Sequence, residues 1–574
     1  MLNNDSGYIE FEVSAYLSDR RMIMIRRIQT KVHLTRHLKT GLAAVMLMSL
    51  FMAGCSQGGT VETPDGKKAE GGKSTEIGST YPLNTNESIK SWEVLNMNAV
   101  TFYSNLADTP FGKALAEKTG VKVEYVHPNE QQTAEQFNLM IASDELPDVI
   151  EYDWTGRSAG SYPGGPEKAI KDGVILELND LIDQYAPNLK KKLEADPELD
   201  KMVKTDSGKY YVFPMIRNPS GLVFRGPMIR KDWLDELNLP VPTTIEEWEK
   251  TLIEFRDKKG AKAPLSVTYT GGNFEIRDAF IGAYRTSNTF YVDDSGKVKY
   301  GPIDPQYKDF LSLFRKWFAE GLFDKDFALT DTKALDNKIL TGQTGATVNL
   351  LSGGLGKWMD AMKEQDPKFK LAATPYPTLK KGEVPFTGQL DFKYNPGPSK
   401  AITTAAKNPE LVARWLDYAY SDEGAMLFNF GIEGESYAME NGKPAYTDLI
   451  KKNEKYSLQQ MVSQYSKPNG PYEADERRNW NTYPEQDEAV KIWRETDAKK
   501  HILPAFITPT EEESKELGKI MTEVNSYKEE MFVKFIVGKE PMESYDHYVE
   551  QIKKLGIERA VEIYQNAMER YNKR

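Results

Sequence analysis

Few residues in this 574-residue sequence have the types and spacing that catalysis or metal binding requires. There is no His-Glu-x-x-His pair for zinc and no Gly-x-x-x-x-Gly-Lys-Ser/Thr loop for phosphate. The five histidines are scattered, at positions 33, 37, 127, 501 and 547. The 85 Asp and Glu residues still allow a carboxylate pair for glycoside hydrolysis, because such a pair forms in space rather than in sequence. We therefore predict no enzyme activity, no cofactor and no metal.

The only cysteine, Cys55, follows a segment typical of protein export. Basic residues between Arg26 and Lys39 precede an uncharged apolar run from Leu42 to Ala53, which is shorter than the ~20 residues of a membrane span. A buried core helix would not be flanked by a basic run and a polar tract. The end of the run, Met52-Ala53-Gly54-Cys55, resembles the lipobox of bacterial lipoproteins, although that family usually has Leu where Met52 stands. The resemblance implies that residues 1–54 are a signal peptide and that Cys55 carries the lipid anchor, on the extracellular face of the cell membrane.

Composition narrows the class of protein further. The sequence is 40% hydrophobic and 28% charged, as in globular proteins, and its net charge of −11 argues against nucleic acid as a partner. Residues 55–90 are rich in Gly, Ser, Thr, Lys and Glu and predict a flexible tether with an r.m.s. span of about 30 Å. With one cysteine, no disulfide can form within the chain, so the core alone must hold the fold.

The globular part is expected to begin near Trp92 with the apolar run VLNMNAVTFY, followed by the helical stretch FGKALAEKTG and the alternating run VKVEYV. Strand, helix, strand, helix and strand follow one another up to Trp154, which predicts an α/β unit with a largely parallel sheet. Ligands bind at the carboxyl ends of strands in such sheets, where Asp153 and Trp154 fall. Further along, Thr243 or Thr244 is expected to cap a helix that holds Glu246 and Glu247 in its first turn.

A series of short motifs, in order along the chain, resembles the extracellular solute-binding proteins of ABC importers. More specifically, the motifs resemble those of the large carbohydrate-binding lipoproteins of Gram-positive bacteria. The motifs are Arg230-Lys231-Asp232-Trp233-Leu234, Leu237 to Thr244, Gly321-Leu322-Phe323-Asp324, Leu340 to Thr347, Asn408-Pro409-Glu410, Ser421-Asp422-Glu423-Gly424 and Phe535 to Lys539.

The resemblance implies an α/β, two-lobe, periplasmic-binding-protein-like (type II) fold with a hinge and an interlobe cleft. Crossing segments are expected around 210–224, 327–334 and 386–403. These place residues 91–212 and 330–395 in lobe 1 and residues 213–329 and 396–574 in lobe 2. The implied function is to capture a carbohydrate, expected to be an oligosaccharide, and deliver it as a monomer to the transmembrane subunits of an ABC permease. The alternative is an exported carbohydrate-active hydrolase or lyase.

Sugars offer hydroxyl groups to planar polar side chains and flat ring faces to aromatic side chains. Polar residues with a nearby aromatic residue, or at a probable strand end or loop, are therefore the expected ligand-binding residues. Each such residue taken singly is more often a cap, turn or core residue than a ligand contact. The predicted set is Asp153, Trp154, Arg217, Asn273, Asn349, Trp358, Glu433, Tyr437 and Trp480.

Overall fold

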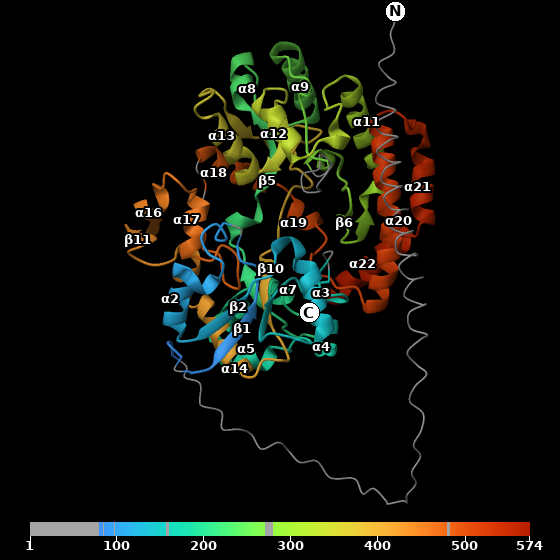
Figure 1. The fold of residues 1–574 in the computed structure, drawn as a ribbon. Coiled ribbons are helices and arrows are strands. Elements are labelled where there is room, and N and C mark those ends of the chain that lie inside the picture. The colour runs from blue at the N-terminus through green and yellow to red at the C-terminus, as the bar shows by residue number, and fades with distance from the viewer. Residues whose placement is uncertain are drawn as a thin grey trace, which may run out of the picture. The chain divides into compact units, whose positions relative to one another are not determined.

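The computed structural model describes residues 80–83, 85–96, 98–156, 160–269, 279–478, 481 and 483–574. All of them fall within one compact unit, residues 75–574. Two separate sheets with helices around them make up most of this unit (Figure 1). We call the part built on the five-stranded sheet the first lobe and the part built on the three-stranded sheet the second lobe.

The first lobe contains a mixed sheet with the strand order β2-β1-β3-β10-β4. β1 is parallel to β2 and β3, in line with the largely parallel sheet that the sequence predicts, whereas β10 is antiparallel to β3 and β4. The first strand was misplaced: β1 ends at Trp92, before the apolar run in which the sequence put it, and begins inside the range 55–90 that the sequence assigned to the tether. The strands are β1 (Ser88–Trp92), β2 (Lys122–Val126), β3 (Val149–Glu151), β4 (Phe213–Ile216) and β10 (Tyr394–Ile402). The helices of this lobe are α2 (Pro110–Thr119), α3 (Thr133–Ser143), α4 (Gly165–Lys171), α5 (Asn179–Tyr185), α6 (Pro187–Ala195), α7 (Pro197–Met202), α14 (Pro409–Asp417) and α15 (Asp422–Phe430).

A small extension follows α15. It consists of the hairpin β11 (Tyr437–Glu440) and β12 (Lys443–Tyr446) with α16 (Asp448–Lys451) and α17 (Leu458–Tyr465). The extension has its own apolar cluster of Ile450, Met461 and Val462 and lies beside α2 (Figure 1).

The second lobe is built on the antiparallel sheet β8-β5-β9. Its central strand β5 (Arg225–Arg230) has five consecutive buried residues, as expected of a strand covered on both faces. The flanking strands are β8 (Ala346–Leu350) and β9 (Leu371–Ala373), and β6 (Phe290–Val292) pairs with β7 (Val298–Tyr300) in a separate hairpin. The helices are α8 (Lys231–Leu237), α9 (Ile245–Lys259), α11 (Pro305–Ala319), α12 (Thr332–Leu340), α13 (Lys357–Met362), α18 (Pro484–Arg494) and α19 (Ala498–His501).

The predicted cap of α9 is confirmed. Thr244 precedes the helix, and its hydroxyl accepts a hydrogen bond from the backbone N–H of Glu247 at 3.2 Å. Glu246 and Glu247 lie in the first turn, where their charge is favourable to the helix dipole.

The strand pairing corrects the predicted division into lobes. β8 and β9 lie in range 330–395, which the sequence placed in lobe 1, but they pair with β5 in the second lobe. Most of β10 lies in range 396–574, which the sequence placed in lobe 2, but it pairs with β3 and β4 in the first lobe. The prediction is wrong for these strands because the chain stays in the second lobe from β5 to β9, and does not return near 330.

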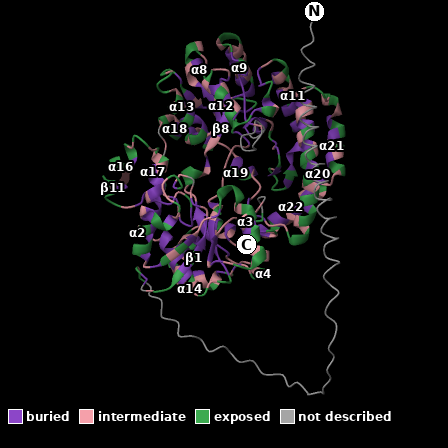
Figure 2. Ribbon diagram, viewed as in Figure 1, coloured by how far each residue is buried: buried purple, intermediate pink, exposed green. Residues whose placement is uncertain are grey.

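Three helices end the chain: α20 (Glu511–Ile536), α21 (Tyr545–Lys554) and α22 (Ile557–Tyr571). α20 packs on α11, and α22 packs on α20 and β7 (Figure 1). Arg574 then reaches the first lobe, where its guanidinium lies 2.6 Å from the Asp206 carboxylate. The buried residues form a large shared core, shown in purple in Figure 2. Within the described ranges, we find no helix with the length and apolar character needed to cross a membrane.

Candidate functional site

A cavity of about 550 Å³ opens at the carboxyl ends of β1 and β3, and we call it the first cavity. This is the edge of the sheet at which α/β proteins bind ligands. Residues after β1, residues after β3, the irregular part of β10 and the segment that follows α17 line it. Its polar lining comprises Glu93, Asn96, Asn98, Glu130, Thr133, Glu151, Tyr152, Asp153, Ser161, Asn395, Ser463, Ser466, Lys467 and Asn469.

Two lysines and two glutamates form a charge network, and three of them, Glu93, Glu151 and Lys467, line the first cavity. The carboxylate of Glu93 accepts hydrogen bonds from the ammonium groups of both Lys400 and Lys467. Lys467 also donates to Glu151 at 3.0 Å. The side chains are 1–10% exposed, and the four residues come from four separate segments of the chain. We call these four residues the tetrad.

The tetrad shifts the pKa values of its two carboxyl groups in opposite directions. Burial alone would raise the pKa of Glu93, but the two neighbouring ammonium groups outweigh it and hold this pKa well below its usual range. Burial, together with the charge of Glu93, raises the pKa of Glu151 to about 7 although Lys467 opposes the shift. The pKa of Lys467 is raised because the attraction of Glu151 and Glu93 exceeds the effect of its burial.

Asp153 is the predicted site residue that the structure places in the first cavity. It comes two residues after β3, and one carboxylate oxygen accepts hydrogen bonds from the backbone N–H (2.8 Å) and the hydroxyl (2.6 Å) of Thr155. These bonds fix the side chain at the sheet edge, where its carboxylate could accept bonds from hydroxyl groups of a ligand.

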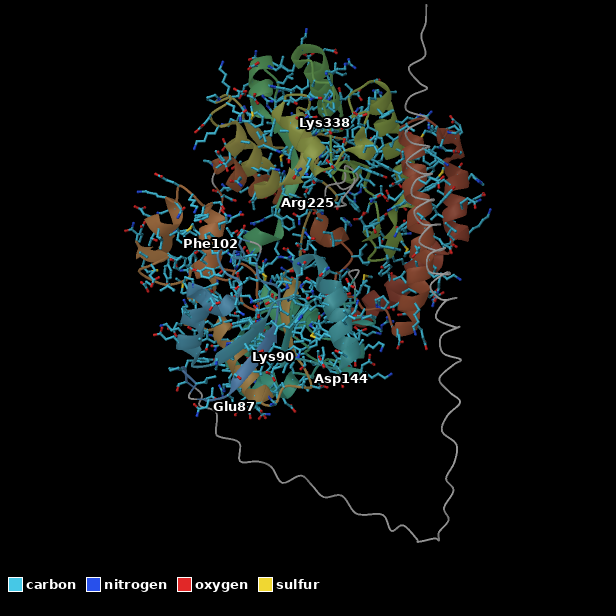
Figure 3. The ribbon with its side chains drawn as sticks, in the orientation of Figure 1. Glu87, Lys90, Phe102, Asp144, Arg225 and Lys338 are labelled. Atoms are coloured by element: carbon cyan, nitrogen blue, oxygen red, sulfur yellow. The ribbon has the colours of Figure 1, made fainter. Side chains whose placement is uncertain are left out.

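A second cavity, of about 760 Å³, is lined by residues from both lobes. The first lobe contributes Gly156, three residues after Asp153. The start of β5, the β6 strand and residues 386–392 contribute Arg225, Tyr291, Phe386, Gln389 and Asp391. Arg225 is labelled in Figure 3, where it lies between the two sheets. Tyr376, His501, Tyr564, residues between 502 and 509 and residues of α20 are also part of the lining. Mixed aromatic and polar walls of this kind suit a saccharide.

Three predicted aromatic contacts are core residues instead. Trp154 and Trp358 are both 0% exposed: Trp154 packs on Phe137 and Tyr162, and the indole N–H of Trp358 donates to Asp336 at 2.8 Å. Tyr437 is 5% exposed and packs against Phe430. Their neighbours cover the ring faces, so the prediction that these side chains stack on a sugar is wrong for this structure.

The other predicted residues are dispersed. Arg217 lies just after β4 and forms an ion pair with Asp391 at 3.1 Å, next to the second cavity. Asn349 is buried in β8, and its side-chain oxygen accepts a bond from the N–H of Leu350. Glu433 is exposed in the turn before β11. Asn273, Trp480 and the predicted lipidation site Cys55 lie outside the described residues.

The sequence reasoning missed the tetrad. Glu151 ends a predicted strand, and this position was the signal that could have found it; Glu93 directly follows β1, a strand that the sequence reasoning did not place. Lys400 and Lys467 lie in segments more than 300 residues away from Glu93 in sequence, and nothing local indicates that they meet it.

Comparisons with known proteins give a consistent result. The model of the family described as "Bacterial extracellular solute-binding protein" matches residues 103–426. The fructooligosaccharide ABC transporter substrate-binding protein FusA of Streptococcus pneumoniae is 27% identical over 414 residues, which are 68% of this chain and 71% of FusA. Lipoprotein LipO of Bacillus subtilis is 26% identical over 425 residues, 71% of this chain and 75% of LipO. The solved structure of the alginate-binding protein AlgQ2 without calcium ion is 25% identical, with a TM-score of 0.63 over 85% of this chain and all of AlgQ2.

Proposed function

The chain belongs to the bacterial extracellular solute-binding proteins, and from this we propose that it is the substrate-binding component of an ABC importer that captures an oligosaccharide. The α/β, two-lobe, periplasmic-binding-protein-like fold predicted from the sequence is confirmed by the same comparisons. The similar proteins named for a fructooligosaccharide and for alginate support a carbohydrate as the ligand class.

One observation carries the proposal: the polar first cavity lies at the carboxyl-end edge of the first-lobe sheet, and the second cavity is lined by both lobes. Asp153 lines the first cavity and Gly156, three residues later, lines the second. A sugar bound there would contact amide and carboxylate groups in the first lobe and the walls of the second. Binding energy shared between two lobes favours their closure around the ligand. Residues 386–392, which line the second cavity and lead from the second lobe into β10, are the proposed hinge segment.

The location and partners of the protein belong to the same proposal. Cys55 carries a diacylglyceryl anchor after removal of residues 1–54, and the residues between Cys55 and the folded body tether that body to the extracellular face of the membrane; the tether is shorter than the predicted range 55–90, because β1 begins at Ser88. There the monomer delivers its ligand to the transmembrane subunits of the permease. Two acyl chains give stable anchoring, whereas one gives only marginal binding.

A hydrolase or lyase remains the alternative, and one observation bears on it. Glu93 and Glu151 are neighbouring carboxyl groups with pKa values pushed apart, which is the pattern of an acid and base pair. Against that role, Glu93 is 1% exposed on its side chain and both its oxygens accept bonds from lysines. We therefore propose a binding protein without turnover.

A binding screen with a product assay tests the proposal. Purified mature protein is heated with oligosaccharides of several classes, and hits are titrated by calorimetry. A true ligand at 100 times its Kd stabilises the folded protein by about 2.7 kcal/mol. The same ligand is incubated with the protein for a day and assayed for new reducing ends or unsaturated products. Binding without product supports the importer component, product release supports the enzyme, and no binding by any oligosaccharide contradicts both.

A further inference from the structure

We infer that the oligosaccharide held in the first cavity is a neutral one, rich in hydroxyl groups and without carboxylates. This inference rests on the proposed function and narrows its ligand class. Similarity does not decide the point, because the similar proteins include one named for a fructooligosaccharide and one named for alginate, a polymer of uronic acids. The inference rests on the charges of the described part of the cavity wall.

Acidic side chains outnumber basic ones in the described lining of the first cavity. Glu93, Glu130, Glu151 and Asp153 are acidic, and Lys467 is the one Lys or Arg among these described lining residues. In the adjoining second cavity, the described lining holds Arg225 and Asp391, so it adds no excess of positive charge. Lys400 and Lys467 balance Glu93 and Glu151, so the net negative charge of the described lining comes from Glu130 and Asp153, and a polyuronate would meet charge of its own sign there.

Lys467 is already committed to the tetrad. Its ammonium group binds Glu93 and, at 3.0 Å, Glu151, and its side chain is only 10% exposed. Lys400 lies behind Glu93 and is 3% exposed. With both glutamates ionised, the two lysines are matched charge for charge. A ligand carboxylate could use Lys467 only by displacing Glu151, and it would then stand beside Glu151 and Asp153, whose charges repel it.

A neutral sugar meets no such obstacle. Its hydroxyl groups can donate to the carboxylates of Asp153 and Glu130 and accept from the side-chain amides of Asn98, Asn395 and Asn469, all on the cavity wall. Hydrogen bonds to ionised acceptors are the stronger kind, so the acidic wall favours polyols as much as it disfavours acids.

The test compares two ligand panels by calorimetry with the full mature protein. The neutral panel contains fructo-, malto- and α-1,4-galacto-oligosaccharides, and the acidic panel contains oligogalacturonates and oligoalginates. The pH is 8, because the pKa of Glu151 is raised to about 7 and both glutamates are then ionised. We expect the best neutral ligand to bind at least tenfold more tightly than any uronate, with little dependence on salt. A uronate that binds more tightly than every neutral sugar overturns the inference but leaves the proposed function standing. If neither panel binds, the proposed function itself fails.

Variants test the physical cause. Glu151→Gln removes one of the two carboxylates that Lys467 pairs with, so uronate affinity at pH 8 should rise at least threefold. The melting temperature of the variant reports whether its fold is intact. Glu130→Gln removes an acid from an exposed position and tests the same repulsion without touching the tetrad. Glu440→Gln, at an exposed residue of β11 away from the cavity lining, is the matched control and should change nothing. If neither cavity variant binds uronates better than wild type and the control, the inference is wrong.

Discussion

Replacing Lys400 by methionine should destabilise the protein far more than the loss of an ordinary ion pair. Methionine keeps most of the length of the side chain, one atom short of lysine, but removes the charge from a position that is 3% exposed. Glu93 loses one of its two cations, and Glu93 and Glu151 must then share Lys467. Breaking a buried pair by removing one partner costs about 3–5 kcal/mol. A charge pair about 4 Å apart at an effective dielectric constant of about 20 gives a similar figure, about 4 kcal/mol.

Equilibrium urea unfolding followed by tryptophan fluorescence measures this loss as a fall in the midpoint at unchanged slope. Lys118→Met is the matched control, because Lys118 pairs with Glu423 at 2.6 Å but both side chains are more than half exposed. That variant should lose less than about 1 kcal/mol. The double variant Lys400→Met with Glu93→Gln leaves the Lys467–Glu151 pair balanced and should regain part of the loss. If Lys400→Met behaves like the control, or the double variant is no more stable than the single one, the reasoning about the tetrad is refuted.

Three further predictions concern other parts of the chain. Trp154→Ala removes a side chain that is 0% exposed and should cost about 3–5 kcal/mol of stability. Oligosaccharide affinity, measured on the folded protein at low temperature, should change less than twofold. A tenfold loss of affinity at native stability would show that Trp154 contacts the ligand. The pKa of Glu151 is about 7 in the folded state and near 4.5 in the unfolded chain, so between these pH values the folded protein holds a proton that unfolding releases. The free energy of unfolding should therefore fall by on the order of 3 kcal/mol as the pH rises from 4.5 through 7. In Glu151→Gln this part of the pH profile should disappear, and an unchanged profile in urea titrations at several pH values would show that Glu151 does not cause it. Cys55→Ser should release the protein from membranes into the medium, and mass spectrometry of the wild-type N-terminus should find a lipidated Cys55; an unmodified thiol would contradict the anchor.

Local patterns determined a good part of the fold. The alternation of strands and helices correctly predicted α2, β2, α3 and β3 and a largely parallel arrangement, but it placed the first strand in the apolar run after Trp92, whereas β1 is Ser88–Trp92. The cap at Thr244 was also predictable, because capping depends on residues within one turn. The position of Asp153 at the cavity follows from the same logic, since the end of a strand places the next residues at the sheet edge.

Burial of individual aromatic residues was not predictable in this way. Trp154 and Trp358 each stand near a polar residue at the end of an element, as a ligand-stacking residue would, but both are covered completely. Which side of a ring faces a neighbour depends on residues from other elements, such as Phe137 and Asp336. The residues next to an aromatic side chain in sequence do not show whether its ring is covered by such distant residues.

The sequence by itself determined the family, through the order of its short motifs, and the elements of the first lobe from α2 to β3. Only the tertiary structure decided that β8 and β9 pair with β5, that β10 returns to the first lobe, and that Lys400 and Lys467 meet Glu93 and Glu151. The physical reason is the range of the interactions. Helix caps and strand periodicity act over a few residues, whereas strand pairing and buried ion pairs join segments that lie tens to hundreds of residues apart and are selected by the packing of the whole core.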